Sequence, residues 1–142
     1  MVPVVNGLPL FFNKQPMLSD YLIYPGAALT IAWGIYHVFP TKKLRDAIER
    51  KNWESREILF MEWVLEGITL IFIGSLVLAV YQSSGGTDET RHIVFRASAA
   101  MLAVMATWTL ITGAITSFKP LQVCPFVKLV GGALIFFGSY LQ

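Results

Sequence analysis

Two glutamates at the mouth of a long apolar run are the residues best suited to chemistry in this chain. Glu62 and Glu66 are four residues apart, and no Asp, Glu, Lys or Arg occurs from Gly67 to Thr87. On a helix this spacing places both carboxylates on one face, about one turn apart. A carboxylate beside or within an apolar segment is costly, so it usually has a charged partner or takes part in ligand binding or proton transfer.

Three further side chains are candidates for the same ligand-binding or proton-coupling site. His37 lies near the end of the first apolar segment, and Lys128 lies near the start of the last one. Trp108 lies within the third segment, where its indole N–H needs a hydrogen-bond partner. For Trp108, a neighbouring threonine or a helix carbonyl competes with a ligand for that role.

The polar groups allow three interpretations. In the first, Lys128 neutralises Glu62 or Glu66 and His37 completes a structural ion-pair network. In the second, the carboxylates and His37 form a binding or proton-coupling site. In the third, Glu62 is interfacial and Glu66 alone is buried. Because Glu66 lies about 6 Å further along the helix, the two acids need not share one environment.

The sequence predicts no catalytic constellation and no metal site. It contains no Gly-rich phosphate loop, nucleophile elbow or cysteine pair. His37 with Glu62 and Glu66 would be a sparse metal-ligand set. The single cysteine, Cys124, is expected to be a small apolar packing residue. We therefore expect no cofactor and no enzymatic activity; the weaker alternative is a membrane enzyme with Glu66 as general base and His37 as acid.

Apolar segments must position these residues. The 142 residues are 55% hydrophobic and 14% charged, with a mean hydropathy of +0.59, whereas a soluble domain has about 25% charged residues. Continuous apolar runs of about 20 residues are typical of membrane-spanning helices. We predict an all-α integral membrane four-helix bundle forming a single transmembrane domain over residues 1–142. The expected helices cover residues 21–39, 58–81, 93–117 and 123–141.

A basic loop, residues 41–57, sets the expected orientation. Eight of the 11 Lys and Arg residues fall on the side of this loop. The positive-inside rule therefore places the loop in the cytoplasm and both termini on the non-cytoplasmic side. The loop is either a short interfacial helix or a solvated connector. Its charges suit anionic lipid headgroups better than nucleic acid, so no nucleic-acid partner is expected.

Part of the chain resembles the DoxX-like group of small four-helix membrane proteins. The resemblance is carried by the segment Ala32–Trp33–Gly34–Ile35–Tyr36–His37, followed by Pro40, and by the run from Glu62 to Gly74. The resemblance implies a four-helix bundle that is a membrane subunit or partner of a larger assembly, with ties to quinone-linked redox chemistry.

These observations lead to two functional expectations. The first is a non-catalytic accessory or assembly subunit of a membrane complex, whose partners are the lipid bilayer and other membrane subunits or further copies of itself. The alternative is a proton-coupled carrier of small molecules, or a lipid- or quinone-binding protein, that uses the Glu and His residues. Both place the chain as a multi-pass protein of the bacterial inner membrane or an equivalent membrane.

Overall fold

The regular structure of this protein is helical throughout the part of the chain that is described. The computed structural model describes residues 17–39, 46, 53–83, 87–113 and 119–141. The helices are α1 (Asp20–Val38), α3 (Trp53–Gln82), α4 (Asp88–Gly113) and α5 (Lys119–Gly138). The all-α prediction with four long helices is confirmed. Most of the expected basic loop, 41–45 and 47–52, lies outside the described residues.

Three helices begin earlier than the apolar runs predicted. The helices α3, α4 and α5 begin at Trp53, Asp88 and Lys119. The charge pattern marks where a segment becomes apolar, whereas backbone hydrogen bonding continues through polar residues that lack a helix breaker. At α4 the start is capped, because Thr87 Oγ1 accepts a hydrogen bond from the Thr90 N–H at 3.3 Å.

Three of the four helices are long and apolar enough to cross a membrane. The spans are Ile58–Gln82, Asp88–Gly113 and Leu121–Gly138. The first helix, expected to qualify as well, is not among them. At 19 residues α1 has sufficient length, but its Tyr, Trp, Pro and His residues lower its mean hydropathy. Composition therefore separates α1 from the other three helices.

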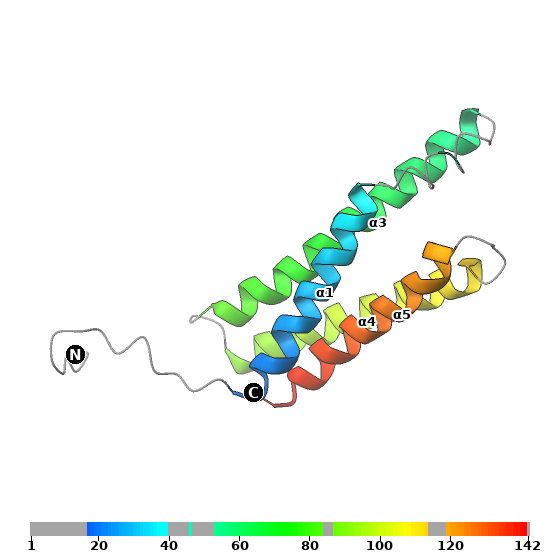
Figure 1. Cartoon of the computed structure of the whole chain (residues 1–142). Helices are drawn as coiled ribbons and strands as arrows, with labels where there is room; N and C mark the ends of the chain where they lie inside the picture. The colour runs from blue at the N-terminus through cyan, green and yellow to red at the C-terminus, as the bar shows by residue number, and fades with distance from the viewer. Residues whose placement is uncertain (1–16, 40–45, 47–52, 84–86, 114–118, 142) are drawn as a thin grey trace, which may run out of the picture.

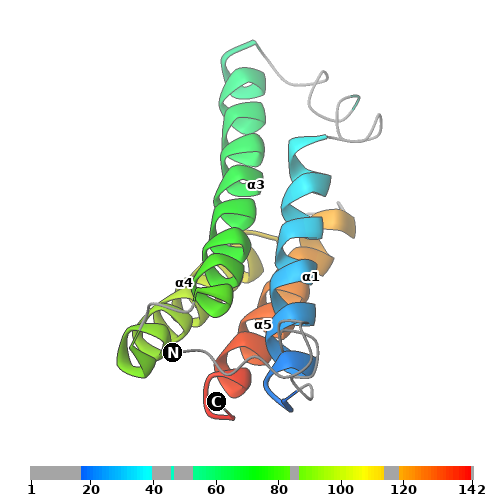
Figure 2. The same cartoon turned by 90° about the vertical axis from the view of Figure 1, so that its left-hand side faces the viewer.

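The helices pack in an open order rather than in a closed ring. α1 packs against both α3 and α5, while α4 packs chiefly against α5 and only slightly against α3. In the lower part of Figure 2, α5 lies between α4 and α1. The α1–α3 pair and the α4–α5 pair diverge toward the end where α3 begins (Figure 1). The start of α1 and the end of α5 lie together at the opposite end (Figure 1).

The core and one close helix crossing hold this arrangement together. At the crossing of α1 and α3, a Cβ on either Gly34 or Gly67 would lie 2.7 Å from the carbonyl oxygen of the other. Such contact requires glycine, and small residues are the usual means of close packing between apolar helices. The crossing sets His37 and Glu66 beside each other. The main core is formed by apolar side chains from all four helices: Ile23, Ala27, Leu70, Ile73, Val77, Phe95, Leu102 and Ile135.

Candidate functional site

One polar cluster, defined here as His37, Glu66, Thr109, Cys124 and Lys128, lies inside the helix bundle. All four helices contribute to it, with α5 supplying two members. His37, Cys124, Thr109 and Lys128 are buried, and the side chain of Glu66 is 21% exposed. A buried group of this polarity is stable only if its members satisfy one another.

Lys128 and Glu66 form an ion pair across the bundle. The Lys128 ammonium donates to Glu66 Oε1 and also to Thr109 Oγ1 at 2.6 Å. Thr109 in turn donates its hydroxyl hydrogen to the Met105 carbonyl at 2.8 Å. The first of the three interpretations paired Lys128 with Glu62 or Glu66, and the structure pairs Lys128 with Glu66. The pair links α3, α4 and α5.

His37 is held in one orientation by its surroundings. Its Nδ1 lies 2.8 Å from the Trp33 carbonyl oxygen; because a carbonyl can only accept, Nδ1 carries the proton and donates. The ring also stacks on Trp63, with centroids 4.4 Å apart. Its Nε2 therefore faces Glu66 Oε2 at 3.8 Å, which is too long for a hydrogen bond.

Cys124 belongs to the polar cluster rather than to the apolar core. Its Sγ accepts a hydrogen bond from the Trp33 indole N–H at 3.2 Å. The same sulfur lies 3.5 Å from His37 Nε2 and 3.7 Å from Glu66 Oε1. The expectation of a simple packing residue overlooked these contacts, because they join α5 to α1 and α3 across long sequence separations.

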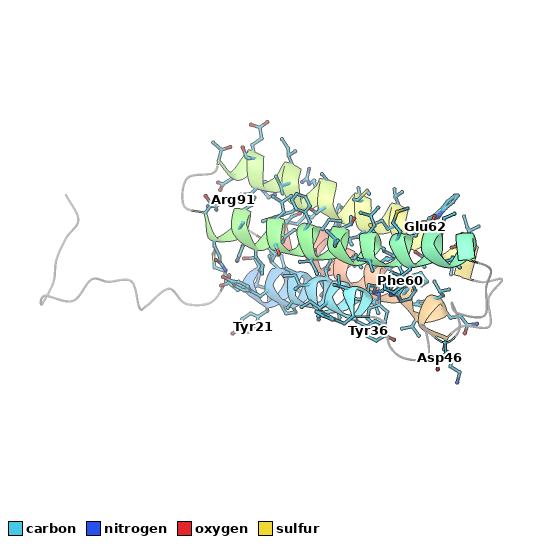
Figure 3. All side chains as sticks on the ribbon, turned by 90° about the horizontal axis from the view of Figure 1, so that it is seen from above. Tyr21, Tyr36, Asp46, Phe60, Glu62 and Arg91 are labelled. Carbon is cyan, nitrogen blue, oxygen red and sulfur yellow. The ribbon has the colours of Figure 1, made fainter. Side chains whose placement is uncertain are left out.

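Two of the five sequence-predicted site residues lie outside the cluster. Glu62 is exposed on α3, toward the same end of the bundle as Tyr36 of α1 (Figure 3). Trp108 is 70% exposed on α4. Of the two glutamates, only Glu66 takes part in the cluster. Over its whole length α3 packs chiefly on α1 and makes little contact with α4.

The sequence carried weak signals for the residues that were missed. Cys124 and Lys128 are four residues apart, as are Trp33 and His37. Each pair therefore shares one face of its helix. A search for polar side chains one turn from a predicted site residue would have found Cys124 and Trp33. Thr109 has no such neighbour among the predicted site residues, and only the packing of α4 on α5 brings it to Lys128.

A shallow apolar groove of about 330 Å³ runs along α4 and α5 beside the cluster. The stem of Lys128 lines one part of it and Arg96 another. Arg96 also lies over the Tyr140 ring, 4.8 Å from its centroid. Most of the remaining lining is small or aromatic: Ala99, Ala100, Ala103, Gly132, Ala133, Phe136 and Phe137.

The cluster combines a carboxylate, an ammonium, an imidazole and a thiol within hydrogen-bonding or near-contact distance. These groups can hold a proton, bind a cation or bond to a polar headgroup. Glu66 is the member with partial access from outside. No known family model, curated protein or solved structure matches this chain.

Proposed function

We propose that this protein is an integral membrane protein and an accessory or assembly subunit of a membrane complex, with both termini on the non-cytoplasmic side. Three apolar helices of membrane-spanning length support its insertion, and the basic segment 41–57 supports the orientation. The quinone-linked assemblies implied by the DoxX-like resemblance are the class of complex to test first.

The open order of the helices is the observation that carries the accessory role. α3 and α4 each pack closely on one neighbour and touch each other little. Their outer faces carry large exposed apolar side chains, including Phe72 at 63% and Val104 at 65% exposure. Another subunit, or a second copy of this chain, would complete the bundle on this open side.

Trp108 supports the same proposal. Its ring is 70% exposed, and its indole N–H has no hydrogen-bond partner among the described residues. An indole N–H in an apolar setting normally finds an acceptor. A neighbouring membrane helix would supply this acceptor while covering the apolar face of α4.

Photo-crosslinking in the membrane tests this role. A photoreactive residue at position 108 should give one discrete adduct, either with another membrane protein or with a second copy of the chain. The matched control places the same residue at Phe137, which is exposed on α5. Equal, diffuse crosslinking from both positions, together with a lone monomer in mild detergent, would contradict the proposal.

The α4–α5 groove favours a second candidate, a proton-coupled carrier or a lipid- or quinone-binding protein. Its volume of about 330 Å³ is at the low end for small-molecule sites. The groove is suited to one apolar chain, with the polar head of the ligand near Lys128 and Glu66. This candidate uses His37, Glu66 and Lys128, whereas the accessory role uses the outer faces.

Two variants separate the candidates. Ala133→Trp fills the groove from an exposed position, and Glu66→Gln neutralises the carboxylate. A phospholipid and an isoprenoid quinone are added to the protein in separate experiments, and the bound ligand is detected by native mass spectrometry. Each variant should retain less of the bound ligand than the unmodified protein. Glu62→Gln, at an exposed site, is the control for Glu66→Gln. Undiminished retention of both ligands in both variants would eliminate the binding function.

A further inference from the structure

Three potential metal ligands converge in the polar cluster from three different helices. His37 Nε2, the Glu66 carboxylate and Cys124 Sγ each offer one donor atom, and these atoms all lie within 4.8 Å of one another. His37 comes from α1, Glu66 from α3 and Cys124 from α5. From this convergence we propose that the three residues bind one zinc-class divalent metal ion inside the bundle.

The separations between the donor atoms fit a tetrahedral ion. Zinc bonds of about 2.3 Å to sulfur and 2.0–2.2 Å to nitrogen and oxygen place neighbouring ligand atoms about 3.3–3.6 Å apart at tetrahedral angles. Here Sγ and Nε2 are 3.5 Å apart. Glu66 Oε2, the oxygen that does not accept from Lys128, lies 3.8 Å from Nε2, and the other oxygen, Oε1, lies 3.7 Å from Sγ. Small rotations of the side chains would close the remaining differences.

The surroundings of His37 and Cys124 match those of metal ligands. A metal-bound histidine commonly donates its other ring N–H to a backbone carbonyl, which directs the free lone pair to the metal. His37 does this through Nδ1 and the Trp33 carbonyl. Trp33 also donates its indole N–H to Cys124 Sγ, so one residue orients both ligands.

The charges and access of the cluster also suit a cation. A Cys124 thiolate and the Glu66 carboxylate would carry two negative charges, of which Lys128 neutralises one through Oε1. A divalent ion would offset the remaining single negative charge and leave a net charge of +1 on the site. It would also bridge Glu66 Oε2 and His37 Nε2, which lie too far apart to hydrogen-bond to each other. The partial exposure of Glu66 provides an entry path. Three protein ligands would leave a fourth position for water or a small ligand, as in zinc sites that keep an open position.

Zinc affinity tests this inference on the full chain purified with a histidine-free tag and stripped with a chelator. Zn²⁺ alone should bind at one equivalent per chain, measured by elemental mass spectrometry and by competition with a chromogenic chelator. Co²⁺ as a second probe should give a thiolate-to-metal charge-transfer band. Cys124→Ser and His37→Gln should lose more affinity than the roughly 10- to 100-fold typical of substitutions around a metal site.

Matched controls make the result decisive. His92→Gln and Glu62→Gln replace the second histidine and the neighbouring glutamate outside the cluster, and both should keep one equivalent and the cobalt band. The cobalt band of the unmodified chain requires no variant, so it remains informative if a variant fails to fold. Absence of stoichiometric Zn²⁺ binding by the unmodified chain, or unchanged affinity in both Cys124→Ser and His37→Gln, would overturn the inference. The accessory role does not depend on this outcome.

Discussion

At the scale of single residues, Glu66 connects the whole polar cluster. One carboxylate oxygen accepts from Lys128, and the other faces His37 Nε2. Glu62, one turn away, is exposed and joins none of these contacts. A single helical turn thus separates a surface acid from an interior one. The difference arises because Lys128, Cys124 and His37 are all presented at the height of Glu66.

Removing the ammonium group should destabilise the fold. Lys128→Met would leave the Glu66 carboxylate without its cation, and breaking a buried pair in this way costs about 3–5 kcal/mol. We expect the low end, about 3 kcal/mol, because the Glu66 side chain is 21% exposed. Thermal unfolding in detergent micelles measures the loss.

The double variant Lys128→Met with Glu66→Gln is the control for this prediction. Replacing both charges leaves no unpaired ion, so most of the lost stability should return. If the single variant is as stable as the unmodified protein, or if the double variant is no better than the single one, the pair does not stabilise the bundle.

At the scale of helices, the α1–α3 crossing determines where the cluster forms. A Cβ at Gly67 would lie 2.7 Å from the Gly34 carbonyl oxygen and 2.8 Å from His37 Cβ. The distance between α1 and α3 at this crossing therefore affects the position of His37. His37 is buried at this crossing, whereas Thr30 is buried against Gly131 of α5.

Replacing Gly67 with alanine should push α1 and α3 apart. The clash with backbone and with His37 should cost about 1–3 kcal/mol, as overpacking commonly does. Gly132→Ala is the matched control, since its nearest contacts, 3.3 Å to Leu102 Cβ and 3.4 Å to the Ala99 carbonyl oxygen, are looser. Thermal unfolding of both variants should show a larger loss for Gly67→Ala than for Gly132→Ala, whose neighbours need to move by only a few tenths of an ångström. Equal effects would contradict the close crossing.

The first helix should insert less efficiently than the others when it is isolated. Ile58–Gln82 of α3 is apolar enough for a membrane span, whereas α1 is not among the candidate spans, and insertion depends on summed side-chain apolarity. A membrane-insertion assay with a glycosylation reporter should give a lower inserted fraction for Asp20–Val38 than for Ile58–Gln82. A higher or equal fraction for α1 would show that α1 needs no help from its neighbours.

At the scale of the whole molecule, the helix order leaves the side between α3 and α4 with little helix packing. α1 and α5 are the inner helices, while α3 and α4 are flanking helices with little mutual contact. The two pairs diverge toward the end that carries the cluster (Figure 1). The proposed partner binding on the flanks and the proposed ligand or metal binding within the bundle would therefore use different surfaces of one small protein.

The orientation of the whole chain is testable with reporter fusions. In the proposed topology α1 crosses the membrane together with the three candidate spans. Four crossings with the basic segment 41–57 in the cytoplasm would place both termini outside. In a bacterial host, alkaline phosphatase fused after Gln142 should be active, and green fluorescent protein at the same place should be dark. The opposite pattern at the C-terminus would overturn the proposed topology.

The helices were predictable because each is a continuous apolar run. Their starts were less predictable, since helix hydrogen bonding extends past the apolar residues, as at Asp88 with its Thr87 cap. In the site, His37, Glu66 and Lys128 were recognisable as ionisable residues in apolar segments. Cys124 and Thr109 were not recognisable as site residues, because a lone thiol or hydroxyl on an apolar helix is usually a packing residue.

Hydropathy along the chain was enough to predict long apolar helices with a few charged residues within them, because hydropathy is a local property. The contacts of Glu66, rather than Glu62, with Lys128 and of Cys124 with His37 were not predictable in this way, because they depend on how the helices pack. Those contacts depend on helix order and on the close approach at Gly34 and Gly67, which bring together side chains up to 87 residues apart.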